Sequence, residues 1–390
     1  MSSIAFTNIA TLVTNDSSLG EGNLGILRNA TLIVEDGLIT EISQGSPSGV
    51  DNEVDCTGKT LLPGFVDSHS HLIFAGDRAE EFAARAHGEK YTAGGIASTV
   101  KATRQASDVQ LRVNAQRLLN EALASGTTTI EIKSGYGLTE KDELRSLAIA
   151  SEFTDETTLL AAHVIPEEFH SNPDGYVDLI INSIIPKSSA KWIDAFCDLG
   201  AFSPEQSEAI LRAGIARGMG ARIHANQLEA GKGVALAVAL DAASADHVSK
   251  STSADIELLA SSNTVATLLP GAEFSTHAQA GLGRRFLDAG ATVAIASDCN
   301  PGSSYTTSMP FCIASAVSLL GFTVEEAVRA ATLGGAKALR RTDIGRLSVG
   351  MRADLVLLQT PSYIHLAYRP GVNLIHSTYK SGRAVTSWQK

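Results

Sequence analysis

Eight short apolar runs rich in β-branched residues repeat along the middle of the chain, separated by stretches with helical periodicity. The stretches between them, such as DVQLRVNAQRLLNEALASG, PEQSEAILRAGIARG and VEEAVRAATLGGAKAL, place apolar residues at i, i+3, i+4 and i+7. The eight runs are LPGFVDSH, TTTIEIKS, TTLLAAHV, WIDAFCDL, GARIHANQ, DAASADHV, TVATLLPG and TVAIASDC. This order predicts an α/β fold, a distorted (β/α)₈ barrel of the TIM type over residues 61–345. A doubly wound open sheet is the alternative, but no glycine-rich phosphate loop follows the first run.

The two ends of the chain have a different pattern, in which apolar and polar residues alternate between Gly and Asp turns. This pattern covers residues 1–60, as in TLIVEDGLITEIS, and residues 346–390, as in LIHSTYKSGRAV. Two unrelated β-rich ends are one interpretation. We favour a single small β-sandwich built from both termini, because neither end alone has enough strands to bury a core.

Composition and charge narrow the class of protein. Of the 390 residues, 44% are hydrophobic, which suits a globular protein, and the net charge of −11 argues against nucleic acid or an anionic membrane as a partner. Cys56, Cys197, Cys299 and Cys312 are scattered without CxxC spacing, which indicates free thiols in a reducing compartment. The first residues lack the features of a signal peptide, and the apolar runs are shorter than a membrane span, so we predict a cytoplasmic protein.

Polar residues that can bind a metal follow the apolar runs at the rim where a barrel carries its active site. His69 and His71 end the first run, and the period of two in an extended strand puts both rings on one face, roughly 6–7 Å apart along the backbone. A single histidine at a strand end is more often a hydrogen-bonded structural residue. Imidazole and carboxylate groups gathered at one rim are instead suitable ligands for Zn²⁺ or iron. The residues that follow later runs are His163, His224, His247 and Asp298.

These motifs resemble the amidohydrolase superfamily, with HSH on the first strand, His on the fifth and sixth strands and Asp on the eighth. Within the superfamily the chain is most similar to hydrolases of histidine degradation that act on carbon–nitrogen bonds of cyclic amides. The similarity runs over nearly the whole chain. Its most specific pieces are HLIFAGDR, IEIKSGYGL, AAHVIP, DAFCDLGAFS, ARIHANQ and SDCNPGSS.

The resemblance implies a small-molecule substrate, 4-imidazolone-5-propanoate, which water opens to N-formimidoyl-L-glutamate, and it also implies a homodimer. It implies one divalent or trivalent metal ion, Zn²⁺ or Fe³⁺. The implied ligands are His69, His71, His224 and Asp298. A metal-bound water would attack the ring carbonyl, with Asp298 carrying the proton and His247 stabilising the oxyanion or positioning the water.

Further positions match substrate contacts of the resembled hydrolases. Arg78 would bind the propionate, because a guanidinium can hold a carboxylate through two parallel hydrogen bonds, although an ion pair with Asp77, Glu80 or Glu81 is the alternative. Gln227 stands where many relatives carry a proton-transferring Glu, and an amide cannot transfer a proton at neutral pH. The other implied substrate contacts are Tyr136, His163, Asn300, Gly302 and Ser303.

Lys133, near the end of the second run, is interpreted as a solvated or structural cation. The lysine that bridges two metals in other relatives belongs on the fourth run, WIDAFCDL, which has none, and this favours a single ion. Cys299 is assigned no role, because a thiol nucleophile would duplicate the metal.

Two other functions remain open. A deaminase of an aminated heterocycle would release ammonia, carry an acid at position 227 and have no need of Arg78. A non-catalytic metal-binding barrel would lack part of the ligand set, whereas this chain has all of it.

Overall fold

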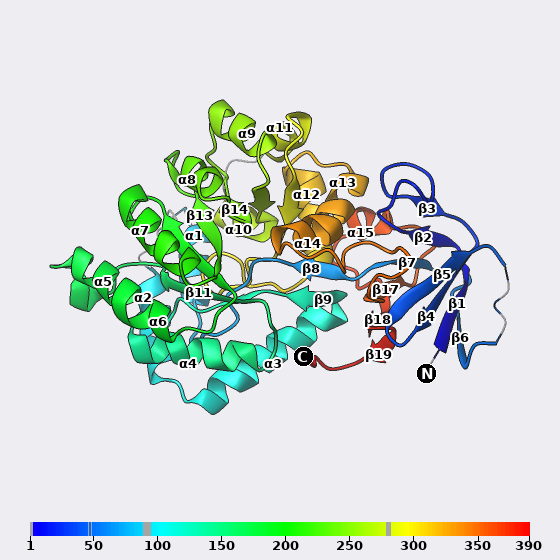
Figure 1. Ribbon diagram of the computed structural model, residues 1–390, viewed down its shortest axis with the longest axis horizontal. Helices are drawn as coiled ribbons and strands as arrows, with labels where there is room; N and C mark the ends of the chain where they lie inside the picture. The colour runs from blue at the N-terminus through cyan, green and yellow to red at the C-terminus, as the bar shows by residue number, and fades with distance from the viewer. Residues whose placement is uncertain (1–2, 46, 48, 89–94, 278–281) are drawn as a thin grey trace.

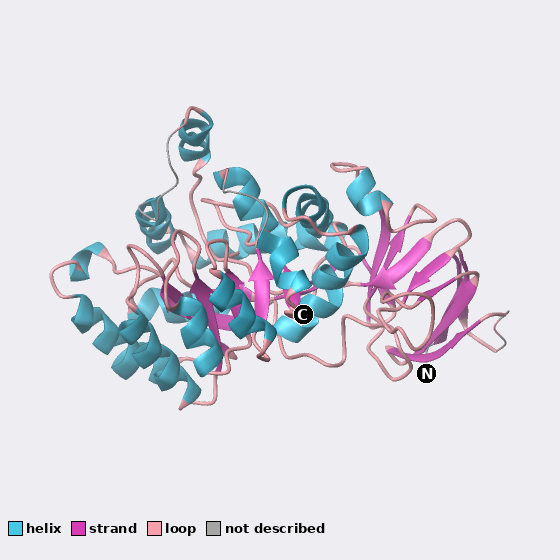
Figure 2. Ribbon diagram, turned by 90° about the horizontal axis from the view of Figure 1, so that it is seen from above, coloured by secondary structure: helices cyan, strands magenta, loops and turns pink. Residues whose placement is uncertain are grey.

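The computed structural model describes residues 3–45, 47, 49–88, 95–277 and 282–390. Two parts lie side by side, a barrel wrapped in helices and a region of sheets that contains both the first and the last strands (Figure 1). Seen from above, helices surround the barrel strands, whereas the sheet region carries few helices (Figure 2).

A seven-stranded parallel sheet forms most of the barrel wall, in the order β10–β11–β12–β13–β14–β15–β16. β8 (Phe65–Asp67) pairs in parallel with β9 (Thr127–Ile130). The segment after β8 closes the ring, because Lys133 N donates to Ser70 O on one side and Asp298 N donates to His69 O on the other, at 2.9 and 3.0 Å. The remaining strands are β10 (Ile132–Lys133), β11 (Thr157–Ala162), β12 (Trp192–Cys197), β13 (Gly220–Ala225), β14 (Ser244–His247), β15 (Val265–Leu268) and β16 (Val293–Ile295).

Each of the eight predicted runs contributes a strand to the barrel, so the predicted barrel is confirmed. One detail of the prediction is wrong, because LPGFVDSH is not a single barrel strand. β7 (Thr60–Pro63) pairs with the C-terminal strand β17 (Leu355–Leu358), and the barrel strand begins only at Phe65. His69 and His71 therefore lie in the extended segment beyond β8 rather than within it.

Helices follow most barrel strands, and their starts have clear sequence causes. Ser107, Ser203 and Thr323 each precede a helix and form a capping box with the residue three positions on, which satisfies backbone N–H groups at the first turn. The α-helices are α1 (Ala79–Ala86), α2 (Ile96–Gln105), α3 (Asp108–Ala124), α4 (Glu140–Ser151), α5 (Pro173–Leu179), α6 (Ile185–Lys187), α7 (Pro204–Ile215), α8 (Gly233–Ala239), α9 (Ser253–Ala260), α10 (Pro270–Thr276), α11 (Leu282–Asp288), α12 (Met309–Leu319), α13 (Val324–Arg329), α14 (Gly335–Ala338) and α15 (His365–Tyr368). π-Helical turns at Ile180–Ile184 and Ala330–Gly334 join α5 to α6 and α13 to α14.

Both termini build the second part, as predicted. One sheet, in the order β5–β4–β1–β6, is entirely N-terminal, and the other, in the order β19–β18–β17–β7–β2–β3, joins strands from both ends. The strands are β1 (Ser3–Ile9), β2 (Thr11–Val13), β3 (Ile26–Leu27), β4 (Ala30–Glu35), β5 (Leu38–Ser43), β6 (Asn52–Asp55), β18 (Ile375–Lys380) and β19 (Arg383–Val385). The predicted boundaries, at residues 60/61 and 345/346, stay a prediction.

Strand β17 contributes side chains to the cores of both parts. Leu355 and Leu357 pack into the core between the terminal sheets, whereas Val356 and Leu358 pack into the barrel core. This alternation follows from the period of two in a β-strand, which sends successive side chains to opposite faces.

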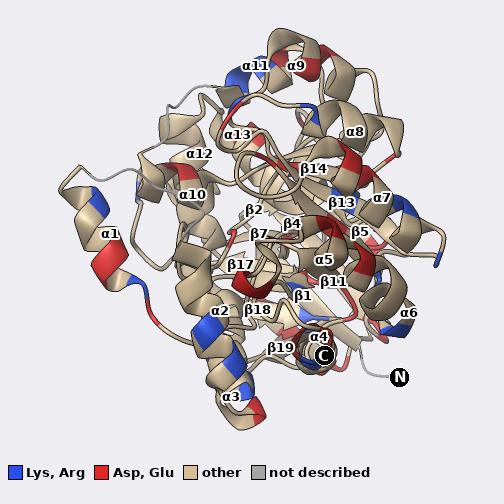
Figure 3. Ribbon diagram, turned by 90° about the vertical axis from the view of Figure 1, so that its left-hand side faces the viewer, with Lys and Arg blue, Asp and Glu red and all other residues tan. Residues whose placement is uncertain are grey.

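The surface helices carry charges of both signs, as on α1 and α3 (Figure 3). Within the described ranges, no helix combines the length and the apolar character needed to cross a membrane.

Candidate active site

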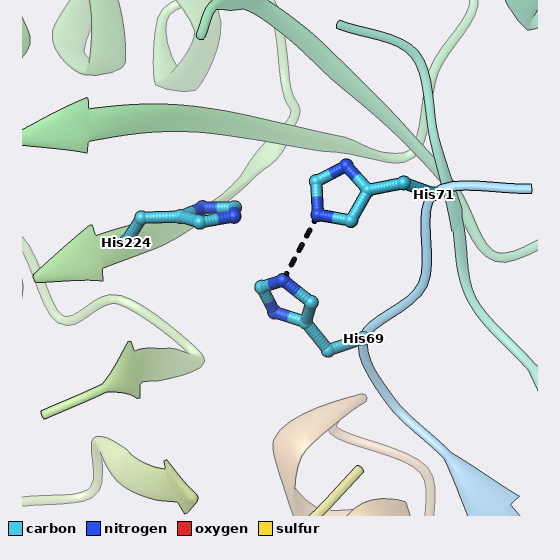
Figure 4. Close-up of side chains that lie close together, drawn as sticks. All are labelled: His69, His71 and His224. Atoms are coloured by element: carbon cyan, nitrogen blue, oxygen red, sulfur yellow. Dashed lines mark hydrogen bonds between the residues drawn. The ribbon is translucent and has the colours of Figure 1, made fainter. Parts of the chain in front are cut away.

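Three histidine side chains from two separate segments point toward one another at the barrel rim (Figure 4). The Nε2 atoms of His69 and His71 lie 3.2 Å apart, and the ring of His224, near the end of β13, lies 4.5 Å from the ring of His69 between centroids. All three side chains are buried. Their ligand atoms lie within 4.8 Å of one another, a spacing that allows one metal ion to contact all three.

Asp298 adds a carboxylate to this cluster. Its Oδ1 lies 3.5 Å from His69 Nε2 and 3.4 Å from His71 Nε2, and its Oδ2 accepts a hydrogen bond from Ser303 Oγ at 3.2 Å. Burial raises the pKa of this carboxyl group. His247 belongs to the same cluster, since its ligand atom lies within 4.8 Å of those of His69 and Asp298.

The backbone is strained where these side chains are presented. Asp298, His247 and Val248 have φ angles of 51°, 72° and 50°, in the left-handed region that non-glycine residues rarely adopt, β-branched residues least of all. Such conformations persist only where the surroundings enforce them, and they concentrate at functional sites. The strained backbone at the ends of the sixth and eighth strands therefore indicates that His247 and Asp298 are held in place for a function.

The ring nitrogens and carboxylate oxygens of this cluster are suited to bind a cation. Burial lowers the pKa of His69 and His71 well below the usual range, so both rings are neutral near pH 7 and can offer a lone pair. Among the described residues, both ring nitrogens of His224 are buried without a hydrogen-bond partner, although Nδ1 lies 3.0 Å from Asp194 Oδ2. Buried nitrogens without partners are costly unless a ligand satisfies them.

A small cavity opens directly onto this cluster, and it gathers most of the predicted site residues. His69 and Gly302 are not among its lining residues, but His69 contacts the lining residue His71 and Gly302 lies against Arg78. Its lining residues are His71, Arg78, Ile96, Tyr136, His163, Phe196, His224, Gln227, His247, Asp298, Asn300 and Ser303.

Arg78 lies at the wall of the cavity and is only 6% exposed. Its Nε and Nη2 donate to the two oxygens of Glu81 at 2.7 Å, and Arg85 donates to Glu81 Oε1 at 3.0 Å and to Gly302 O at 2.8 Å. The predicted alternative, an ion pair with a neighbouring acid, is therefore present, but it holds the guanidinium at the cavity rather than on the surface. A Cβ at position 302 would lie 2.1 Å from Arg78 Nη1, so this packing requires glycine there.

The loop after Asp298 is held by Asn300. Its Oδ1 accepts hydrogen bonds from the N–H groups of Gly302 and Ser303, both at 2.8 Å, and its Nδ2 donates to Asp298 O at 2.6 Å. The Asn300 side chain thus shapes the loop that presents Ser303 to Asp298.

The opposite wall of the cavity is aromatic. His163 stacks on His71 with ring centroids 5.4 Å apart, and Tyr136 lies 5.3 Å from His163. His163 Nδ1 hydrogen-bonds Gly135 O at 2.9 Å, which leaves its Nε2 edge as the one available to a ligand. Gln227 also lines the cavity, and its backbone N–H donates to Asp198 at 2.6 Å.

Beneath the histidines lies a group of buried charged residues that the sequence interpretation missed. Lys133 is fully buried, so the alternative of a solvated cation is wrong and the structural one holds. A signal for this group was present in the sequence. Glu131 and Lys133 in TTTIEIKS, and Arg222 and His224 in GARIHANQ, are charged or polar pairs spaced by two. The new members are Glu131, Asp194, Arg222 and Asp246.

Comparison with known proteins agrees with this fold. A family model described as the amidohydrolase family matches residues 201–385. The structure is similar to that of a triazine hydrolase variant, with a TM-score of 0.75 at 17% identity over 99% of this chain and 95% of the other. It is also similar to guanine deaminase from C. acetobutylicum with bound guanine, with a TM-score of 0.71 at 15% identity over 98% of this chain and 100% of the other. Both solved structures share the fold of this chain, and the family model matches part of it.

Two relatives show to which family the chain belongs. The chain is 57% identical to an imidazolonepropionase from Mycolicibacterium smegmatis over 100% of this chain and 98% of the relative. It is 56% identical to one from Streptomyces griseus over 99% of this chain and 100% of the relative. The chain belongs to the imidazolonepropionase family.

Proposed function

We propose that the protein hydrolyses the ring amide of 4-imidazolone-5-propanoate to give N-formimidoyl-L-glutamate, a step of histidine degradation. Water forms a new C–O bond at the ring carbonyl, the C–N bond of the ring breaks, and a proton passes to the departing nitrogen. The observation that carries this proposal is one small cavity that brings Arg78 to the same space as the His/Asp cluster. Membership of the imidazolonepropionase family supports it independently.

One metal ion, Zn²⁺ or Fe³⁺, is proposed at the cluster. When bound, it would lower the pKa of a water molecule and polarise the carbonyl, which makes hydroxide available at neutral pH. A single ion is favoured because Lys133 contacts Glu131 and Asp194 and is not placed to bridge two ions. The proposed ligands are His69, His71, His224 and Asp298.

Asp298 and His247 are the proposed proton-handling residues. Asp298 faces the cluster with one oxygen and Ser303 with the other, so it can take a proton from water and pass it to the departing ring nitrogen. Burial lowers the pKa of His247 to about 3, so its ring is neutral at pH 7 and can donate a hydrogen bond to the developing oxyanion or orient the water. Gln227 contributes hydrogen bonds only.

Arg78 is proposed to bind the propionate. Glu81 takes two of its five N–H groups, so three remain, including both on Nη1. Tyr136 and His163 would flank the imidazolone ring, and the loop that contains Asn300, Gly302 and Ser303 would contact the substrate. The homodimer and the cytoplasmic location stay predictions.

The direct test is to incubate the metal-loaded protein with 4-imidazolone-5-propanoate while following the loss of its ultraviolet absorbance. N-formimidoyl-L-glutamate as the product, without ammonia, is the expected result. Absence of turnover in protein shown to contain metal would rule out the proposal, and ammonia release would favour the deaminase alternative.

A further inference from the structure

The charged group beneath the metal ligands is organised around one lysine. Lys133 Nζ lies 2.9 Å from Glu131 Oε1, 2.9 Å from Asp194 Oδ2 and 3.9 Å from Asp246 Oδ2, and all four side chains are 0% exposed. Arg222 completes the group, with Nη2 3.3 Å from Asp246 Oδ2. This buried lysine contacts three carboxylates, which come from β12, β14 and the connection between β9 and β10, and its charge links these segments.

Each of these carboxylates also reaches the proposed metal ligands. Asp246 Oδ2 is 2.8 Å from His69 Nδ1, and Asp194 Oδ2 is 3.0 Å from His224 Nδ1. A carboxylate at Nδ1 favours the tautomer with its proton there, which turns the Nε2 lone pair toward a metal and fixes the ring orientation. The two histidines are therefore oriented from below by two acids that Lys133 contacts.

Glu131 contacts the backbone between the proposed ligands His69 and His71. Its Oε2 accepts a hydrogen bond from Ser70 N at 3.1 Å, and its main-chain oxygen accepts one from Ser70 Oγ at 2.5 Å. Ser70 lies between His69 and His71, so this acid holds the segment that carries both. The Lys133 contacts thus extend to all three histidines.

The charges of the group also favour a cation above it. Three carboxylates, Glu131, Asp194 and Asp246, face two cations, Lys133 and Arg222. When all five are ionised, one negative charge remains uncompensated in a region shielded from water, where electrostatic interactions are strong. Without Lys133 the three acids would repel one another, and the histidine contacts would lose their fixed geometry.

We propose that Lys133 is a positioning residue for the metal, acting through Asp194, Asp246 and Glu131 to orient His224, His69 and the backbone of His71. This inference rests on the metal site of the proposed function. It assigns Lys133 no contact with the metal or with the substrate.

The test compares metal binding in two variants of the full-length protein. Lys133→Met keeps a long side chain without the charge. Ile193→Ala changes the residue beside Asp194 on the opposite face of β12, where Ile193 packs against Gly214 of α7, away from the charged group. Zn²⁺ affinity is measured by competition with a chromophoric chelator, the Co²⁺-loaded protein is compared by its visible absorption, and the melting temperature is recorded for each.

We expect Lys133→Met to bind Zn²⁺ about 10–100-fold more weakly and to show an altered Co²⁺ spectrum. Ile193→Ala should melt at a lower temperature with unchanged Zn²⁺ affinity and spectrum. Affinity within twofold of the parent in Lys133→Met, or an equal loss in Ile193→Ala, would overturn the inference.

If Lys133→Met does not fold, Lys133→Met/Glu131→Gln removes one charge of each sign and is expected to show the same weaker affinity, while parental affinity in it would overturn the inference. Because every readout is metal binding or stability, the proposed function can fail separately. A parent protein that binds Zn²⁺ tightly but does not open the imidazolone would contradict the function and leave the role of Lys133 standing.

Discussion

The barrel rim and the core between the terminal sheets bury different kinds of side chain. Between the sheets lies an apolar cluster that includes Phe6, Leu32 and Leu357, and the buried polar residues of these sheets are mostly uncharged, such as Thr7 and Thr31. Beneath the barrel rim Lys133 and Asp246 are just as inaccessible. Burying charges costs free energy even when they are paired, whereas burying leucines releases it. The rim is therefore built for binding and chemistry, whereas the terminal sheets contribute stability.

The largest effect is expected from Asp298→Ala. It removes the carboxylate proposed both to hold the metal and to carry the proton, so kcat should fall by about 10³-fold or more. Stability should change little, because burying this carboxylate costs free energy that the alanine does not. Steady-state kinetics and thermal melting of the same preparations check this. Turnover above a tenth of the parent rate would remove Asp298 from the mechanism.

Acid should lower the free energy of unfolding through the buried histidines of the barrel rim. The pKa of His247 is lowered to about 3 by burial, and those of His69, His71 and His163 are also well below 6.5. The unfolded chain takes up these protons near pH 6.5 and the folded one does not, so stability is complete above that pH and declines as the pH falls toward 3. His247 alone accounts for a loss on the order of 4 kcal/mol.

Urea unfolding of the metal-free protein between pH 7 and pH 4 measures this loss. In His247→Asn the decline should be shallower by about one proton. A free energy of unfolding that stayed constant over this range would show that the histidines are not buried in their neutral form.

Leu357→Ala should have the opposite effect to Asp298→Ala. Leu357 is fully buried in the core between the terminal sheets, and its truncation should destabilise the protein by about 2–5 kcal/mol while kcat of the folded enzyme stays within twofold. Denaturant unfolding and kinetics at low temperature measure the two quantities. A large fall in kcat would mean that the terminal sheets influence the chemistry.

Arg78→Ala should show the smallest effect, confined to substrate binding. Loss of a charge-assisted contact to the propionate is worth about 1.5–3 kcal/mol, which corresponds to a rise in KM of roughly 10–100-fold with a smaller change in kcat. Arg112→Ala is the matched control, because Arg112 lies on the surface in an ion pair with Glu152. Unchanged KM in Arg78→Ala would assign the propionate to another residue.

Much of the fold and of the candidate site could be predicted from the sequence. The eight barrel strands and the sheet region from both termini follow from periodicity, which depends on local burial alone. The clustering of His69, His71, His224 and Asp298 follows from barrel topology, which brings the ends of parallel strands to one rim.

Other features depend on packing that periodicity does not describe. The division of LPGFVDSH between two sheets depends on how β7 pairs with β17, some 290 residues further along the chain. Lys133 was interpreted without its partners, since the acids that surround it come from β12, β14 and the short connection between β9 and β10. Pairing of Arg78 with Glu81 was one of several options, and only the structure places that pair at the cavity.

We propose that hydrolysis of the cyclic amide requires one metal ion at the rim. Titration of the metal-free protein with Zn²⁺ or iron, while the opening of 4-imidazolone-5-propanoate is measured, tests this requirement directly. We expect no turnover without metal, and activity that rises in proportion to added metal and saturates at one equivalent per chain. Full activity in the metal-free protein, or saturation only at two equivalents, would contradict this claim.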